Sequence, residues 1–92
     1  MTCLDGGSGR IQMKLYSTYV LLSKKDKKHY IGYTSDLEER LKAHQGGCVE
    51  STKNRRPLEL VYYEGCVSKE KAEAREKYFK TGFGRKFLKS RI

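Results

Sequence analysis

Two β-rich segments separated by a basic turn constrain the fold of this chain most strongly. Residues Tyr16–Leu22 concentrate Tyr, Thr and Val, and His29–Tyr33 continues the strand-like pattern after a break. The break, Lys24–Lys28, contains four lysines and one aspartate. This arrangement predicts a β-hairpin with a basic turn.

A helix is predicted directly after the hairpin. Ser35, followed by Glu38 three residues later, fits a capping box with Ser35 as the N-cap. Leu37 and Leu41 lie one helical turn apart and are expected to face the core. Because Gly46-Gly47 is typical of a helix end, the helix is expected to span about residues 36–45.

A third strand and a second helix are predicted further along the chain. Leu58–Glu64 is apolar, β-rich and short enough to be a strand. Val67 and Ala72 then fit a hydrophobic staple around Ser68 as N-cap, opening a helix that lasts until Thr81-Gly82.

Two basic stretches complete the chain. Residues 48–57 are polar, close with the only proline and predict a loop that can touch a ligand. The last thirteen residues contain no acidic residue and predict a basic helix or arm anchored by Phe83, Phe87 and Leu88. The cations of this tail are Lys80, Arg85, Lys86, Lys89 and Arg91.

The length of 92 residues fits a single domain with a small core. The order of elements predicts an α/β (α+β) fold in which a small three-stranded antiparallel sheet is flanked by about three helices. Residues 1–12 are Gly-rich and aperiodic, so they are interpreted as a disordered leader or an expression remnant, with the domain at 13–92.

The charge points to a polyanionic partner. Twenty Lys and Arg against eleven Asp and Glu give a net charge of +9, which favours nucleic acid. An anionic membrane surface would call for an amphipathic basic helix with large apolar residues opposite, and the chain has no Trp. A basic structural protein of a ribonucleoprotein would show the same charge.

The cysteines indicate neither a disulfide framework nor a zinc ribbon. Cys3, Cys48 and Cys66 are odd in number and contain no C-x-x-C pair. Cys48 lies near His44, but no third ligand follows at a spacing that would suggest zinc or a Cys-His hydrolase. With no apolar stretch of about 18 residues, we expect a cytoplasmic protein without a membrane partner.

Several motifs in order resemble the GIY-YIG nuclease superfamily over about residues 14–92. They are Ser17-Thr18-Tyr19, Tyr30-Ile31-Gly32, Arg40, His44 and Ala74-Arg75-Glu76-Lys77. Further stretches resemble the small stand-alone branch related to the N-terminal nuclease domain of the UvrC excision-repair protein, namely residues 32–41, 52–57 and 81–89. The chain departs from the family in its first triplet, and the C-terminal asparagine of many members has no counterpart, since Asn54 is the only asparagine.

The resemblance implies an active site and a mechanism. Tyr19 would be the general base or its relay, and Tyr30 would position the water or the phosphate. Arg40 would stabilise the transition state, and His44 would orient a tyrosine or shuttle protons. Glu76 would hold Mg²⁺ or Mn²⁺, and no small-molecule cofactor is expected.

The residues themselves leave alternatives open for the helix side chains. Arg40 and His44 are four apart on one helix face, where a guanidinium can pair with phosphate oxygens. Arg40 could instead pair with Asp36, and His44 could be a cation at the helix C-terminus. Both tyrosines could be ordinary core residues.

Glu76 also has two interpretations. On a helical wheel it lies at the border of the apolar stripe formed by Ala72 and Phe79, where a carboxylate is partly desolvated. A carboxylate is also the kind of ligand that Mg²⁺ accepts, with water and substrate phosphate completing its shell. The alternative is a surface glutamate paired with Lys80.

The leading hypothesis is a metal-dependent endonuclease that hydrolyses structured or single-stranded DNA, in DNA repair or recombination. The alternative is a catalytically weak or inactive nucleic-acid-binding module of the same fold. Cations of the loop and tail are expected to contact the DNA backbone, unless they only solubilise the protein. They are Lys53, Arg55, Arg56, Arg85, Lys86 and Lys89.

Overall fold

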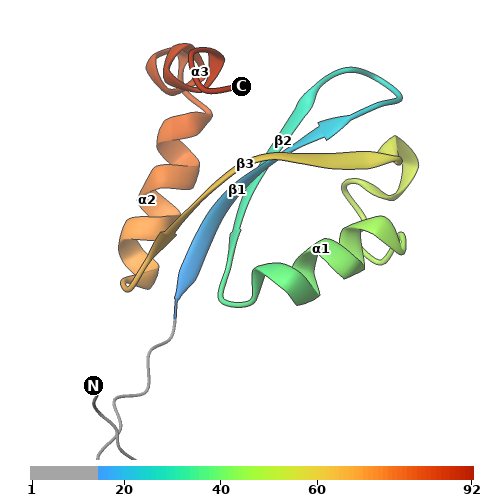
Figure 1. The fold of residues 1–92 in the computed structure, drawn as a ribbon, viewed down its shortest axis with the longest axis horizontal. Helices are drawn as coiled ribbons and strands as arrows, with labels where there is room; N and C mark the ends of the chain where they lie inside the picture. The colour runs from blue at the N-terminus through green and yellow to red at the C-terminus, as the bar shows by residue number, and fades with distance from the viewer. Residues whose placement is uncertain (1–14) are drawn as a thin grey trace, which may run out of the picture.

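A three-stranded antiparallel sheet with helices on both faces forms the domain (Figure 1). The computed structural model describes residues 15–92, so the predicted leader at 1–12 lies outside the described residues. The elements are β1 (Tyr16–Ser23), β2 (His29–Thr34), α1 (Leu37–Gln45), η1 (Lys53–Arg55), β3 (Leu58–Cys66), α2 (Lys69–Phe79) and α3 (Gly82–Lys89). The predicted sheet with about three helices is confirmed.

The strand order β2-β1-β3 makes β1 the central strand. The predicted hairpin is present: β1 and β2 pair antiparallel, with Tyr19 opposite Gly32 and Leu21 opposite Tyr30. In its basic turn Lys27 takes a φ of 63°, a left-handed conformation that closes the connection. On the other side β3 pairs antiparallel with β1, and the register shifts between Val20 and Leu21.

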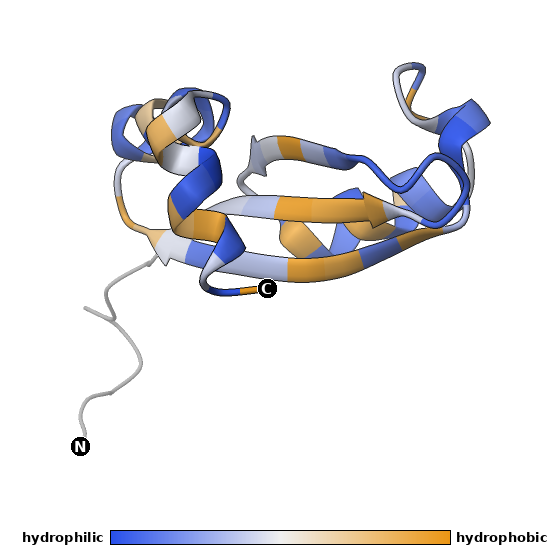
Figure 2. Cartoon of the chain, turned by 90° about the horizontal axis from the view of Figure 1, so that it is seen from above, coloured by the Kyte–Doolittle hydropathy of each residue, from blue (hydrophilic) through white to orange (hydrophobic). Residues whose placement is uncertain are grey.

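The alternation of β1 builds one small core on each face of the sheet. Tyr19, Leu21 and Leu58 pack on the face covered by α1, through Leu37 and Leu41 as predicted. On the other face Val20, Ile31, Phe79 and Leu88 pack beneath α2 and α3. Figure 2 shows apolar segments within the strands and hydrophilic residues along the connecting loops.

The N-cap of α1 differs from the prediction. Asp36, not Ser35, has extended backbone angles and accepts a hydrogen bond from the backbone N–H of Glu39 at 3.1 Å. Thr34 in turn accepts one from the N–H of Asp36 at 3.1 Å. The predicted capping box at Ser35 is wrong. Ser35 and Asp36 are both residue types that can cap a helix, and because α1 begins at Leu37, Asp36 occupies the N-cap position.

Ser68 caps α2 as predicted, accepting a hydrogen bond from the N–H of Lys71. The staple is wrong, because Val67 is 67% exposed while Ala72 is fully buried. The helix ends at Phe79 rather than at Thr81-Gly82. None of the helices among residues 15–92 is long and apolar enough to cross a membrane.

The predicted basic tail is α3, capped by the side chain of Thr81. Leu88 is buried in the core and Phe87 packs against it, as expected. Phe83 does not anchor the tail, because it is 80% exposed. The buried face of α3 runs through Gly84, Phe87 and Leu88, and Phe83 lies about a quarter-turn away from it.

Gly84→Ala is expected to destabilise the domain. A Cβ at position 84 would meet the backbone of α2, including the Phe79 Cα at 2.6 Å, and backbone cannot move aside cheaply. We expect a loss of about 2 kcal/mol or more. Gly82→Ala in the same helix is the control, because nothing lies within 4 Å of its Cβ, so it should be neutral or stabilising by up to about 1 kcal/mol. Urea unfolding measures both, and equal stability of the two variants would contradict this packing.

Candidate active site

Three buried side chains from separate segments form a hydrogen-bonded chain under α1. The Tyr19 hydroxyl on β1 lies 2.9 Å from Nε2 of His44 on α1. The other ring nitrogen, Nδ1, lies 2.8 Å from Oγ1 of Thr52, just before η1. Each residue is at most 1% exposed. Tyr19 and His44, both predicted as site residues, are therefore in direct contact.

Tyr30 joins this cluster through its ring. Its centroid lies 5.2 Å from that of His44, edge to face, and 6.4 Å from that of Tyr19. In the sheet register Tyr30 is two residues from Gly32, the partner of Tyr19. Because side chains two residues apart on a strand share a face, both tyrosines lie on the α1 side of the sheet.

The absence of a side chain at Gly32 leaves space for the Tyr19 ring. A Cβ at position 32 would lie 2.7 Å from the Tyr19 hydroxyl oxygen and 2.9 Å from the ring carbon that bears it. The glycine of the Tyr30-Ile31-Gly32 motif therefore admits the Tyr19 hydroxyl beside β2, close to the ring of Tyr30.

Arg40 acts on the same tyrosine oxygen from the exposed side of α1. Burial raises the pKa of Tyr19, and hydrogen bonding from the Arg40 guanidinium opposes that rise. The same interaction raises the pKa of Arg40. The alternative interpretation paired the Arg40 guanidinium with the Asp36 carboxylate. The hydrogen bond that the structure shows between these residues joins backbone groups, the Arg40 N–H and the Asp36 carbonyl, at 3.0 Å. Tyr19, Tyr30, Arg40 and His44 thus form one cluster.

His44 is a neutral imidazole in this cluster. Burial, and secondarily the positive charge of Arg40, lower the pKa of His44 to about 4. The alternative interpretation of His44 as a helix C-terminal cation would require the charged imidazole, which this lowered pKa disfavours. Both ring nitrogens are engaged, which fixes the orientation of the ring.

Glu76 lies on α2, on the other side of the sheet, and its charge acts on the cluster. Its negative charge contributes to the raised pKa of Tyr19. The Glu76 side chain is 19% exposed, which agrees with the expected partial desolvation, and pairs with Lys80 at 3.3 Å. The partial desolvation expected of a metal ligand and the ion pair expected of a surface glutamate are therefore both present. The role of Glu76 as a metal ligand stays a prediction.

The donor set suits a hard cation that relies on substrate for most of its shell. No group of three or more His, Cys, Asp or Glu residues that could hold a metal occurs within residues 15–92. A single partly buried carboxylate such as Glu76 fits Mg²⁺, which keeps several waters and takes phosphate oxygens. It does not fit zinc, which needs a fuller protein ligand set.

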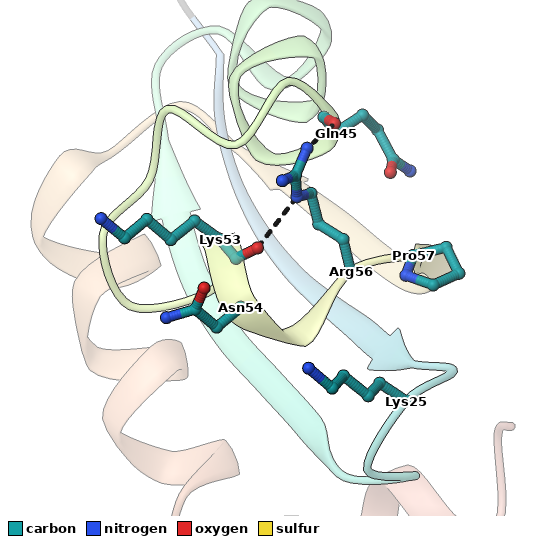
Figure 3. Close-up of a pocket in the computed structure, with 6 residues that line it drawn as sticks. All are labelled: Lys25, Gln45, Lys53, Asn54, Arg56 and Pro57. Carbon is teal, nitrogen blue, oxygen red and sulfur yellow. Dashed lines mark hydrogen bonds between the residues drawn. The ribbon is translucent and has the colours of Figure 1, made fainter.

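The cations of the 48–57 loop make contacts with neighbouring residues, and two of them line a pocket. Arg56 lines an open pocket of about 550 Å³ together with Lys25, Gln45, Lys53, Asn54 and Pro57 (Figure 3). Its Nε donates to the Lys53 carbonyl at 2.9 Å and its terminal nitrogen donates to the Gln45 carbonyl at 3.3 Å. Lys53 pairs with the exposed Glu50 at 3.3 Å. Lys25 of the hairpin turn, which lies in no functional motif of the sequence, adds a cation to this pocket.

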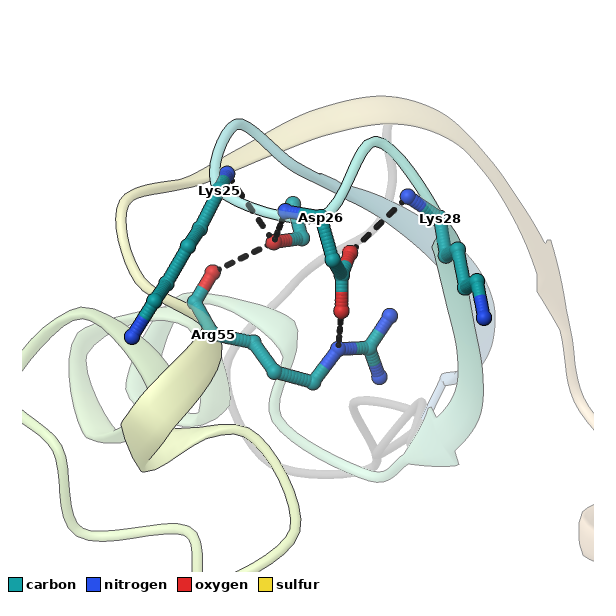
Figure 4. A network of polar contacts seen from close by, with 5 residues as sticks. Lys25, Asp26, Lys28 and Arg55 are labelled. Atoms are coloured by element: carbon teal, nitrogen blue, oxygen red, sulfur yellow. Dashed lines mark hydrogen bonds and ion pairs between the residues drawn. The ribbon is translucent and has the colours of Figure 1, made fainter.

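Arg55 belongs to a network that ties this loop to the hairpin turn (Figure 4). Its Nε donates to Asp26 at 2.8 Å, and its carbonyl accepts from the Ser23 hydroxyl at 2.6 Å. Hydrogen bonds from the Lys28 N–H and then from Arg55 hold the pKa of Asp26 near 2. Arg55 thus has a structural partner, and its proposed contact with DNA stays a prediction.

The remaining predicted DNA contacts lie on α3. Arg85, Lys86 and Lys89 are exposed. None of them takes part in an ion pair within the described part of the chain. Their charges are therefore available to a ligand.

Comparisons with known proteins identify the family. The family model described as "GIY-YIG catalytic domain" matches residues 15–89. The chain belongs to the GIY-YIG catalytic-domain family. That match covers every residue of the cluster around Tyr19 as well as Glu76.

The relatives carry the family name UPF0213. A UPF0213 protein of Clostridium perfringens is 45% identical over 67% of this chain and 69% of its own length. The UPF0213 protein YazA of Bacillus subtilis is 41% identical over 67% of this chain, and the match spans 64% of its length. A UPF0213 protein of Streptococcus pneumoniae is 41% identical over 65% of this chain and 62% of its own length. The matched segment thus spans a little under two thirds of two of these relatives.

A solved structure supports the fold. The solution NMR structure of a UPF0213 protein from Bacillus halodurans matches with a TM-score of 0.53 and 33% identity, covering 83% of each chain. The finer resemblance to the UvrC branch stays a prediction, because these relatives bear only the UPF0213 name.

In this GIY-YIG domain, Gly32→Ala is expected to disrupt the cluster. The new methyl group would overlap the Tyr19 hydroxyl, so the ring or β2 must shift, at a cost of about 1–3 kcal/mol. Gly65→Ala on β3 is the matched control, because nothing lies within 4 Å of its Cβ. Thermal unfolding compares them, and a Gly32→Ala variant as stable as Gly65→Ala would refute the close approach of Tyr19.

His44 is expected to make the domain acid-sensitive. The pKa of His44 is about 4 when folded, against an ordinary 6.5, so below pH 6.5 the unfolded chain takes up a proton that the folded chain rejects. The stability contributed is present above pH 6.5 and decreases by roughly 3 kcal/mol by pH 4. Urea unfolding from pH 7 to 4 should show this slope in wild type and in a variant of the exposed His29, but not in His44→Gln. An unchanged slope in His44→Gln would contradict the assignment.

Proposed function

We propose that this protein is a metal-dependent endonuclease that hydrolyses phosphodiester bonds in DNA. The observation that carries the proposal is the Tyr19 hydroxyl, buried 2.9 Å from Nε2 of His44 and close enough to the Arg40 guanidinium for this cation to oppose the rise in the pKa of Tyr19. A core tyrosine needs only one partner for its hydroxyl. Convergence of a second donor, a permanent cation, is typical of a site in which the tyrosine oxygen gains negative charge.

The proposed reaction uses Tyr19 as the base. Its phenolate oxygen takes a proton from a water molecule, and the water oxygen forms a bond to phosphorus. The phosphorus–oxygen bond to the departing sugar breaks, and that oxygen leaves with the electron pair and is protonated from solvent. Burial raises the pKa of Tyr19 and favours its neutral phenol, whereas Arg40 favours the phenolate and offsets part of the effect of burial, so Arg40 lowers the cost of forming the base.

Arg40 and Tyr30 would act on the phosphate. Arg40 lies on the exposed side of α1, so its guanidinium can reach a non-bridging phosphate oxygen while still bonding to Tyr19. The half-buried Tyr30 ring packs against His44, which would hold its hydroxyl ready to position the water or the phosphate. These two roles are carried over from the family.

Glu76 would hold the metal. A bound Mg²⁺ or Mn²⁺ would stabilise the charge on the phosphate and on the departing oxygen. Glu76 would have to exchange its ion pair with Lys80 for the cation, and a pair four residues apart on a helix contributes only about 0.5 kcal/mol. The ion pair is therefore no obstacle to metal binding.

Two basic surfaces would bind the DNA backbone. The pocket that contains Lys25, Lys53 and Arg56 lies beyond the C-terminal end of α1, and α3 exposes Arg85, Lys86 and Lys89. Contacts of cations with phosphates position a substrate without reading its sequence. Structured or single-stranded DNA, of the kind processed in repair or recombination, is the proposed substrate class.

Cleavage of labelled DNA tests the proposal. With Mg²⁺, the wild type should cut one or more of single-stranded, nicked and branched substrates, and chelation should abolish cutting. Tyr19→Phe and Glu76→Gln should each lower the rate about 100-fold or more. Glu73→Gln is the control on the same helix, since the ion pair of Glu73 within residues 15–92 is with Lys77, at 4.0 Å, and this variant should cut at the wild-type rate.

The other outcomes separate the rival functions. DNA binding that weakens steeply with salt, without cleavage of any substrate, would replace the proposal with the nucleic-acid-binding module. Equal cutting by Glu76→Gln and wild type would remove Glu76 from the site.

A further inference from the structure

Phe83 exposes an aromatic ring to solvent at the start of α3. Its surface is 80% exposed, the highest value among the exposed large apolar residues of the described part of the chain. The second aromatic residue of this helix, Phe87, is stacked on Phe79 with 5.9 Å between the ring centroids. The guanidinium groups of Arg75 and Arg91 lie over the Phe87 ring, at 5.3 and 4.8 Å from its centroid. Phe83 has no such ring or cation contact within residues 15–92, so its ring is available to a ligand.

The rest of the solvent face of α3 is positively charged. Arg85, Lys86 and Lys89 are exposed and take part in no ion pair within residues 15–92. Lys86 lies one helical turn after Phe83, so these two side chains are neighbours on the helix. The last acidic residue of the chain is Glu76, and α3 therefore has no acidic side chain to offset its charge. We call the exposed set Phe83, Arg85, Lys86 and Lys89 the α3 surface.

The α3 surface lies close to the proposed metal ligand. Glu76 lies about one turn before the end of α2 at Phe79, and α3 begins three residues after that end, at Gly82 (Figure 1). The two helices are packed together at Gly84, where an added Cβ would lie 2.6 Å from the Phe79 Cα. A strand bound on the α3 surface can therefore extend to Glu76.

An open aromatic ring beside uncompensated cations fits one class of ligand. The cations attract phosphates, and the ring stacks on a flat base. In a duplex each base is paired and stacked between its neighbours, so a side chain reaches a base face only after the base is unstacked. The ring therefore favours a strand with unpaired bases, whereas the cations alone favour any nucleic acid.

We propose that the α3 surface binds single-stranded DNA, with an unpaired base stacked on Phe83 and the neighbouring phosphates contacting Lys86, Lys89 and Arg85. As a statement about the substrate, this inference rests on the proposed function and narrows its substrate class to DNA with unpaired bases near the cleaved bond. As a statement about binding, it requires no cleavage.

Two other occupants of this surface fit less well. A second copy of the chain packed on it symmetrically would bring cations against cations, in a protein with a net charge of +9. A membrane-surface helix needs a broad apolar face, but Leu88 of α3 is buried in the core and Phe87 packs against it. Phe83 alone is left for such a contact.

Binding to labelled DNA in the presence of a chelator tests the inference without cleavage. Fluorescence anisotropy compares an oligothymidine of about 15 nucleotides, which cannot pair with itself, with a duplex of the same length. Phe83→Ala should weaken binding of the single strand about tenfold, as for the loss of one stacked base, and leave duplex binding within about twofold. Val67→Ala is the control, because Val67 is also an exposed apolar residue, at 67%, and lies outside the α3 surface. Unchanged single-strand affinity in Phe83→Ala, or an equal loss for the duplex, would overturn the inference.

A tryptophan in place of the ring reports stacking directly. The chain has no Trp, so Phe83→Trp supplies a single indole that can be excited selectively. Saturation with oligothymidine should quench its fluorescence, because a base stacked on an indole quenches it, and the duplex should quench it far less. Val67→Trp should show no such change. Binding of oligothymidine without quenching in Phe83→Trp would show that the base does not stack on this ring and would refute the proposed contact.

Salt dependence and rival ligands complete the test. Lys86→Gln should weaken binding of single strand and duplex alike, and lower the slope of log affinity against log salt by about one. Sedimentation and binding to phosphatidylserine vesicles follow the other occupants. If Phe83→Ala abolishes a dimer or vesicle binding but keeps its affinity for oligothymidine, the surface belongs to a second copy or to a membrane, and the inference is wrong.

The outcomes also separate this inference from the proposed function. If oligothymidine binds through Phe83 but no DNA is cut when Mg²⁺ is added, the nuclease proposal fails while the α3 surface stands. If DNA is cut but Phe83→Ala binds the single strand as wild type does, this inference fails alone.

Discussion

The space above Gly32 is the constraint on which the site depends. The Tyr19 hydroxyl occupies the volume that a side chain at position 32 would fill. Tyr19 is on the central strand and is almost fully buried, so it cannot turn away without opening the sheet. Its hydroxyl is thereby held against His44 from one side while the Arg40 guanidinium acts on it. A glycine on an edge strand and a tyrosine on the central strand together define the position of the proposed base.

The central strand also joins the two sides of the site. Tyr19 faces α1, whereas its neighbour Val20 packs with Phe79 of α2 on the opposite face. Thr18 donates a hydrogen bond to the Ala72 carbonyl at 2.9 Å, tying α2 to the same strand. Glu76 therefore keeps a set position relative to Tyr19 although it belongs to a different layer.

Much of this architecture could be predicted from the sequence because it depends on local signals. The hairpin, the third strand, the Ser68 cap and the packing of Leu37 and Leu41 all follow from periodicity or capping within a few residues. The predictions were wrong where two neighbouring residues could each fill the same structural position. Asp36 caps α1 in place of its neighbour Ser35, and Phe83 sits beside the buried face of α3 but not on it.

In the site, too, the residues that belong to a sequence motif could be predicted, whereas those that act through contacts distant in the sequence could not. The family motifs singled out Tyr19, Tyr30, Arg40 and His44, which the structure brings together. Thr52 carries no local signal, because its partner is eight residues away on α1 and is reached only through the fold of the loop. Asp26 looked like one more charge in a basic turn, yet it anchors Arg55. Such residues are recognised by the bonds they make rather than by their type.

In the cluster around Tyr19, one residue supplies positive charge and another supplies a hydrogen bond. Arg40 is a permanent cation, and together with burial it keeps His44 uncharged, with a pKa of about 4. A second cation beside Tyr19 would stabilise the phenolate further, but would make it too weak a base to take a proton from water. A neutral imidazole can orient the Tyr19 hydroxyl through a hydrogen bond without adding charge, while Arg40 acts on the same hydroxyl through its positive charge. If Tyr19 is the base, as proposed, burial of His44 is part of its tuning, and the strand and loop that bury His44 would act on the chemistry through that burial.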